Sequence, residues 1–238
     1  MVVVKGNHMS VSQAYPLYSL FMSRKKAHSN LIKVEDPNKE DERKRILRDV
    51  YWKTLEEYVK LDDLKFSKDP KALVTVLELE CGEALEARTL CAYLKRGKHR
   101  SEEVTDFLYY GIDNQQMIKA TKQNYEKNNP KQHPLVTTQL FNFEEQIPGY
   151  LPEMAVVVFN NLDRRTKTYT AWKGSINEGI DLLRKDGILI CTLDSTEDAR
   201  DFRIIISDRC DIHKDRKNIF APKEYPETYD HIIVGKKR

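Results

Sequence analysis

The stretch VTVLELECGEALEA, residues 74–87, decides the fold of this chain. It begins as a mostly apolar run typical of a buried strand, and it continues through an acidic turn into a helical pattern. A strand, a tight turn and a helix in this order often mark the place where an α/β sheet meets a nucleotide-like ligand. Glu80 and Ala84, however, stand at two positions of the turn where glycine is expected.

The composition is that of an ordinary globular protein. The chain has 238 residues, of which 40% are hydrophobic and 32% charged, enough for one large domain or two small ones. Its apolar runs are far shorter than the ~18 residues that a membrane-spanning helix needs, and its N-terminus does not look like a signal peptide. A net charge of +3 neither demands nor excludes a nucleic acid partner.

The chain has four cysteines, Cys81, Cys91, Cys191 and Cys210, without the close spacing of zinc or redox sites. Cys81 and Cys191 lie in apolar strand patterns, where reduced cysteine behaves as a small hydrophobic residue. We therefore expect a reducing, intracellular setting, that is, a cytoplasmic protein, and no metal site.

Short apolar runs alternate with helical patterns in the second part of the chain. Strands are expected at 74–79, 107–112, 136–141, 154–159, 188–193, 202–207 and 231–234. Helices are expected at 36–61, 84–95, 115–128 and 171–185, the last one stopped by Gly187. This alternation implies parallel strands joined by right-handed crossovers. The last two strands have no convincing helix between them and should form a closing antiparallel pair.

The ends of the expected strands are the places where a ligand should bind. Asp113 closes the second strand, where a carboxylate can accept hydrogen bonds from both hydroxyls of a ribose. Its distance from Gly82 exceeds the ~20 residues usual in dinucleotide-binding folds, and the polar insertion KRGKHRSEEVTD accounts for the excess. The alternative is that Asp113 only caps the next helix. The Gly82 turn favours ribose binding.

With these elements in order, residues 73–238 resemble a class I S-adenosylmethionine-dependent methyltransferase. The resemblance is carried by the segments VLELECGEA, YYGIDNQQMIKATKQNY, VTTQLFNFEEQIP, AVVVFNNL, SINEGIDLLRKDGILICTL and YDHIIVGKKR. It implies an α/β fold with a Rossmann-like, seven-stranded, mostly parallel sheet of order 3-2-1-4-5-7-6, preceded by an N-terminal helical extension. The expected division is 1–68 for the extension and 69–238 for the methyltransferase-like domain.

The resemblance also implies S-adenosylmethionine as cofactor. Its contacts are then expected from Glu78, Glu80, Cys81, Gly82, Asp113, Asn114, Asn142, Phe143 and Asn160. Asn142 could accept a hydrogen bond from the adenine amine through its carbonyl, or it could be a plain turn residue. Glu80 replaces the first glycine of the loop, and it could face solvent, meet the α-ammonium of the cofactor or block the site. No catalytic residue is evident, because methyl transfer often needs little beyond alignment.

The leading interpretation is thus a methyltransferase whose methyl acceptor, a small molecule, protein or RNA, is unidentified. The alternative is an inactive, methyltransferase-like scaffold that binds a partner. A nicotinamide-dependent oxidoreductase is a weaker third hypothesis, because the loop has too little glycine to cradle a pyrophosphate. The segment NNLD, residues 160–163, differs from the family signature for planar-nitrogen methylation.

Basic and aromatic clusters give weaker signals. Arg164 and Arg165 follow the fourth strand and could meet an acidic or phosphate-bearing substrate. Nucleic acid is a possible partner but is not specifically indicated. No membrane partner is expected. The basic run HKDRK, residues 213–217, is expected to be solvated surface, His213 included. The aromatic cluster AYPLYSLFM, residues 14–22, could be permanent core or a lid over the cofactor pocket.

Overall fold

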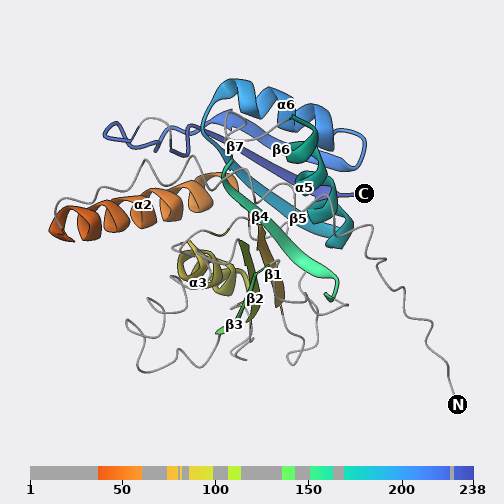
Figure 1. Ribbon diagram of the computed structural model, residues 1–238, viewed down its shortest axis with the longest axis horizontal. Helices are drawn as coiled ribbons and strands as arrows, with labels where there is room; N and C mark the ends of the chain where they lie inside the picture. The colour runs from red at the N-terminus through yellow and green to blue at the C-terminus, as the bar shows by residue number, and fades with distance from the viewer. Residues whose placement is uncertain are drawn as a thin grey trace, which may run out of the picture.

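The computed structural model describes residues 37–60, 74–79, 81, 86–98, 107–113, 136–142, 151–162, 169–225 and 228–238. Within these ranges the chain forms one seven-stranded sheet with helices on both faces (Figure 1). The aromatic cluster at 14–22, the helix expected at 115–128, and Arg164 and Arg165 lie outside the described residues.

The sheet has the order that the resemblance implies, β3-β2-β1-β4-β5-β7-β6. Its strands are β1 Val74–Leu79, β2 Phe107–Asp113, β3 Val136–Asn142, β4 Met154–Leu162, β5 Leu183–Leu193, β6 Cys210–Lys217 and β7 His231–Lys237. The described helices are α2 Pro37–Tyr58, α3 Ala87–Lys98, α5 Tyr169–Leu182 and α6 Thr196–Ile206. Strands β1 to β5 pair in parallel, and β7 runs antiparallel to β5 and β6. The predicted fold class and strand order are confirmed.

Two apolar cores form because successive residues of a strand point to opposite faces of the sheet. Val76 of β1 and Val158 of β4 pack on the face that carries α2 and α3. Leu77 and Phe159 pack on the other face, with residues of α5 and α6. The sheet is therefore covered on both sides, which explains the near-continuous apolar sequences of its central strands.

Helix α2 belongs to the first of these cores. Its apolar stripe buries Tyr51 and Leu55 completely against the sheet. Its last turns are also held by the end of β6 and the residue after it. Asn218 Nδ2 donates to Thr54 Oγ1 at 2.9 Å, and the Tyr58 hydroxyl donates to the Lys217 carbonyl at 3.3 Å. These bonds join parts of the chain far apart in sequence, so α2 packs as part of the sheet domain.

The strand expected at 202–207 was wrong, because these residues belong to α6. Ser195 caps this helix, since its hydroxyl accepts from the Asp198 backbone nitrogen at 3.1 Å. Ala199, Phe202 and Ile206 are buried at helical spacing, a pattern that the short apolar run conceals. The strand that pairs with β7 is instead the polar segment β6, and edge strands are often polar.

The boundary between α5 and β5 also differs from the prediction. The helix ends at Leu182 and the strand begins directly at Leu183. Gly187, predicted as a helix stop, lies inside β5, where a Cβ would come within 2.7 Å of Leu183 Cδ1 and 2.8 Å of the Arg184 carbonyl oxygen. Close packing, not the end of a helix, explains this glycine.

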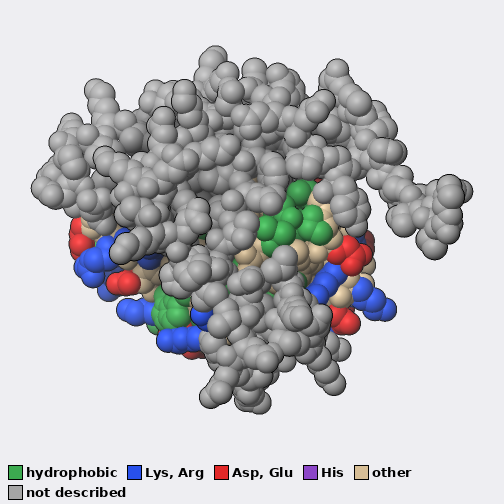
Figure 2. All heavy atoms as spheres, turned by 90° about the horizontal axis from the view of Figure 1, so that it is seen from below, with side chains coloured by type: hydrophobic (Ala, Val, Ile, Leu, Met, Phe, Trp, Pro, Cys, Tyr) green, Lys and Arg blue, Asp and Glu red, His purple; other side chains and the backbone are tan. Residues whose placement is uncertain are grey.

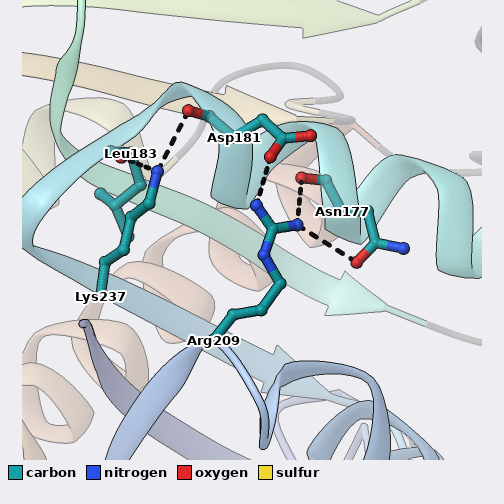
Figure 3. Close-up of polar contacts among 5 residues, drawn as sticks. All are labelled: Asn177, Asp181, Leu183, Arg209 and Lys237. Atoms are coloured by element: carbon teal, nitrogen blue, oxygen red, sulfur yellow. Dashed lines mark hydrogen bonds and ion pairs between the residues drawn. The ribbon is translucent and has the colours of Figure 1, made fainter.

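Two basic side chains hold the C-terminal end of α5 on the sheet (Figure 3). Lys237 Nζ donates to the carbonyl of Asp181 at 3.2 Å and also to that of Leu183. Arg209 donates to the Asn177 carbonyl at 3.2 Å and forms an ion pair with Asp181. Cations in this position satisfy the last carbonyls of a helix and complement its dipole.

The four cysteines are free and buried, so the prediction that Cys81 and Cys191 pack as apolar residues is confirmed. Burial, reinforced by the charge of Glu78, raises the pKa of the Cys91 thiol to about 12.

Within the described ranges, no group of three or more His, Cys, Asp or Glu side chains is arranged to hold a metal ion. Nor is any described helix long and apolar enough to cross a membrane. The face shown in Figure 2 carries described side chains of both charges.

Two glycines of α5 provide a matched test of how tightly this helix packs. A Cβ at Gly174 would have no atom within 4 Å, so Gly174→Ala should stabilise the protein by about 0.5–1 kcal/mol through helix propensity. A Cβ at Gly179 would lie 2.7 Å from Phe159 Cζ, so Gly179→Ala should destabilise it by about 1–3 kcal/mol. Urea denaturation measures both. Equal effects of the two substitutions would contradict the packing of α5 described here.

Candidate functional site

Polar side chains from four neighbouring strands meet near the carboxyl ends of the parallel sheet. The Glu78 carboxylate of β1 accepts a hydrogen bond from the Tyr109 hydroxyl of β2 and another, at 2.7 Å, from Asn160 Nδ2 of β4. Asn160 Oδ1 accepts a hydrogen bond from Thr192 Oγ1 of β5 at 3.3 Å. One chain of hydrogen bonds, the strand-end network, therefore crosses β2, β1, β4 and β5.

The strand-end network is almost completely buried. Glu78 is 1% exposed and Asn160 is 8% exposed, while Tyr109 and Thr192 are inaccessible to solvent. Burial, followed by the nearby charge of Glu78, raises the pKa of Tyr109 well above its usual value. The hydroxyl therefore stays protonated and remains a donor to the carboxylate. Such a satisfied buried network fixes the relative positions of the strand ends.

Helix α2 brings a further buried hydroxyl to this region. Burial raises the pKa of Tyr51 well above its usual value, and the charge of Glu78 adds to this rise. This hydroxyl lies near Asn160 but makes no hydrogen bond of normal geometry to a described residue. The Tyr51 ring stacks on Tyr229 at a centroid distance of 5.7 Å, and the Tyr229 hydroxyl donates to the Glu86 carboxylate before α3. Helix α2, which precedes β1 in the chain, thus contributes to the region of the site.

Asp113 and Asn142 are neighbours at the ends of β2 and β3. They are paired directly across the two strands, each as the last residue of its strand. Asp113 lies one residue beyond Ile112, the partner of Leu79 at the end of β1. The positions predicted to meet the ribose and the adenine of a nucleoside are thus adjacent at the carboxyl edge.

The structure therefore brings together part of the predicted site. Glu78 and Asn160 touch each other, and Cys81 is buried directly after β1. The remaining predicted contacts, Glu80, Gly82, Asn114 and Phe143, lie outside the described residues, as does Ala84.

Sequence reasoning missed Tyr109, Thr192 and Tyr51. Tyr109 and Thr192 stand in the apolar runs FLYYGID and GILICTL, where they read as ordinary strand residues. The available signal was the alternation of side chains along a strand. Each of these two residues lies an even number of positions from one that faces α2 and α3, so its side chain points to that same face.

No protein-family model matches the sequence, and no curated protein sequence matches it. Solved structures, by contrast, match its fold. The PH0226 protein of Pyrococcus horikoshii is 12% identical, with a TM-score of 0.51, over 78% of this chain and 89% of that chain. Magnesium protoporphyrin IX methyltransferase (ChlM) from Synechocystis PCC 6803, with bound SAH, is 12% identical, with a TM-score of 0.50, over 82% and 86%. TrmN from Thermus thermophilus is 12% identical, with a TM-score of 0.51, over 79% and 48%.

These similarities establish the fold of the chain. It is the α/β fold of class I S-adenosylmethionine-dependent methyltransferases, with seven strands in the order expected from the sequence. The resemblance noted in the sequence is confirmed at the level of the fold.

Proposed function

We propose that the protein is an S-adenosylmethionine-dependent methyltransferase. The observation that supports this most is the pairing of Asp113 with Asn142 at the carboxyl ends of β2 and β3, beside a β1 strand that ends after Glu78. In open α/β sheets a ligand binds beyond these ends. A carboxylate suits the two ribose hydroxyls and an amide carbonyl suits an adenine amine. The residues present therefore fit the nucleoside part of the cofactor.

In this proposal the residues of the chain bind and orient, and the cofactor, when bound, supplies a methyl group on a sulfonium. Asp113 would hold the ribose and Asn142 the adenine, as the first anchors of the cofactor. The strand-end network would keep β1, β2, β4 and β5 in the register that these contacts need. Alignment of an acceptor atom with the methyl group then provides the catalysis, which is an effect of proximity.

The methyl acceptor is left open in this proposal, as a small molecule, protein or RNA. Arg164 and Arg165 would meet an acidic or phosphate-bearing acceptor.

Calorimetry with S-adenosylmethionine and S-adenosylhomocysteine tests the proposal directly. Asp113→Ala should weaken the binding of either by about 1–3 kcal/mol, the range for a hydrogen bond to a charged group. This corresponds to a roughly 5- to 150-fold rise in dissociation constant. Asp208→Ala, at an exposed aspartate after α6, is the matched control and should bind like the unmodified protein. Unchanged affinity in a folded Asp113→Ala variant would remove Asp113 from the site.

A specific feature of the sequence favours a second function. Glu80 and Ala84 replace two glycines of the loop after β1, and a side chain at the first position could obstruct the cofactor. The chain would then be an inactive scaffold that binds a partner. The absence of binding to either ligand at millimolar concentration supports this alternative.

Glu80→Gly separates the possible roles of the glutamate. If Glu80 obstructs the site, the variant should bind S-adenosylmethionine more tightly than the unmodified protein. If Glu80 holds the α-ammonium group, affinity should fall by about 1–3 kcal/mol, as for Asp113. We expect a tolerated glutamate, so that the unmodified protein binds the cofactor. Calorimetric titration of both proteins under the same conditions measures the difference.

A further inference from the structure

A small hollow lies where the end of α2 meets β5, β6 and β7. Its lining includes the apolar residues Val59 after α2 and Ile188 of β5. It also includes the basic residues Lys60, His213, Lys214 and Lys236. These four residues come from three separate segments, the end of α2, β6 and β7, and the fold brings them around one concavity.

A bulge in β6 places two basic residues side by side at this hollow. Ile212 pairs with Gly235 and Lys214 pairs with the adjacent Val234, so His213 is one extra residue in the strand. Side chains normally alternate along a strand, but a bulge lets two consecutive residues face the same side. His213 and Lys214 both line the hollow as a result. Bulges often aim a side chain at a functional position.

The charge at this hollow is unbalanced. Lys236 Nζ forms an ion pair with Asp186 at 3.0 Å. Among the described residues that line the hollow there is no aspartate or glutamate. The described lining thus carries three lysines and His213, and the nearby Asp211, which pairs with Lys236 across β6 and β7, already forms an ion pair with Arg238. Tyr58 also lines the hollow, and its hydroxyl already donates to the Lys217 carbonyl and accepts from the Ile219 backbone nitrogen.

We propose that this hollow binds a phosphate-type oxyanion. Ammonium groups have donors only and act as compact positive charges, so a multiply charged anion with several acceptor oxygens fits them best. Charge-assisted hydrogen bonds from lysines on different segments would hold it. The oxyanion could belong to a free phosphate compound or to the backbone of a nucleic acid.

The proposed anion site is separate from the candidate cofactor site. Cys191 of β5 pairs with Phe159 at the carboxyl edge of the sheet. Ile188 lies three residues before Cys191, so the hollow is about 10 Å along the strand from that edge. Asp113 and Asn142 lie further away, at the ends of β2 and β3 on the other side of β1. Anion binding is therefore independent of the proposed methyltransferase activity.

Amide chemical shifts of the whole chain, titrated with inorganic phosphate at constant ionic strength, test the proposal. Saturable shifts should appear at the amides of Lys214 and Gly235. The double variant Lys60→Gln/Lys214→Gln should weaken phosphate binding about tenfold, since each exposed charged hydrogen bond contributes modestly. Lys173→Gln, at an exposed lysine of α5 on the opposite face of the sheet, should bind phosphate normally.

Shifts that do not saturate, or equal affinity in the double variant and the unmodified protein, would overturn the proposal. A single-stranded RNA oligomer then distinguishes the source of the phosphate. If the oligomer binds more tightly than phosphate and the double variant weakens both, the site takes a nucleic acid backbone. If only phosphate binding responds to the double variant, the site takes a free phosphate compound. Both of these outcomes retain the anion site.

Discussion

Replacing Glu78 by alanine should lower the free energy of unfolding by about 3–5 kcal/mol. The carboxylate accepts hydrogen bonds from the Tyr109 hydroxyl and from Asn160 Nδ2, and all three side chains are buried. Alanine would leave both donors without this acceptor in a region closed to water, and each unsatisfied buried donor costs about 1–3 kcal/mol. The lost carboxyl group would also leave a cavity. Urea denaturation followed by circular dichroism measures the change.

Glu153→Ala is the matched control for this variant. Glu153 is an exposed glutamate directly before β4, and its removal should change stability by no more than about 0.5 kcal/mol. A Glu78→Ala variant as stable as this control would show that the strand-end network does not hold the strands together. Because the measurement needs no cofactor, it tests the structural role of Glu78 apart from any role in binding.

The alternation of strands and helices could be predicted because it depends on features that a sequence displays directly. The order of the strands in the sheet was instead implied by the resemblance to class I S-adenosylmethionine-dependent methyltransferases. The apolar runs of β1, β2, β4 and β5 are long enough to recognise, and the helical patterns between them imply parallel crossovers. The position of Asp113 at the end of β2 follows from the same pattern, since the polar residue comes where the apolar run stops. The alternation of elements and the place of Asp113 therefore rest on periodicity, which neighbouring residues reveal.

The strand-end network could not be predicted in the same way. Glu78 and Asn160 were each placed at a strand end, but their contact depends on β1 and β4 lying next to each other with Glu78 opposite Val158. Thr192 joins through the β4–β5 pairing. Such contacts link residues far apart in sequence, and only the register of the sheet decides which polar side chains meet.

The prediction of a strand at 202–207 failed for a related reason. Phe202 to Ile206 are apolar enough to read as a strand, whereas the side chains of β6 are mostly polar. Helix α6 buries only one of its faces, and β6 lies at the edge of the sheet, where pairing needs backbone groups more than apolar side chains. The Ser195 cap was the local signal that favoured the helix.

Replacing Phe159 by alanine should lower the free energy of unfolding by about 3–5 kcal/mol, the usual range for a buried aromatic residue. Phe159 is inaccessible to solvent and packs edge-on against Phe202, at a centroid distance of 6.0 Å. It stands directly before Asn160, so its ring supports the strand-end network from the opposite face of β4. Urea denaturation measures the loss in the free energy of unfolding. A loss no larger than that of the exposed control Glu153→Ala would contradict this packing.

The Phe159→Ala background also changes the effect of Gly179→Ala. In the unmodified protein the new Cβ would meet Phe159 Cζ at 2.7 Å, and this contact is the main reason for the expected destabilisation. Without the ring, the methyl group would partly fill the space, and alanine also gains about 0.5–1 kcal/mol of helix propensity over glycine. Gly179→Ala should therefore become neutral or stabilising, giving a coupling of about 1–3 kcal/mol in a double-mutant cycle. The same cost of Gly179→Ala in both backgrounds would mean that backbone strain in α5, not contact with β4, makes glycine necessary at this position.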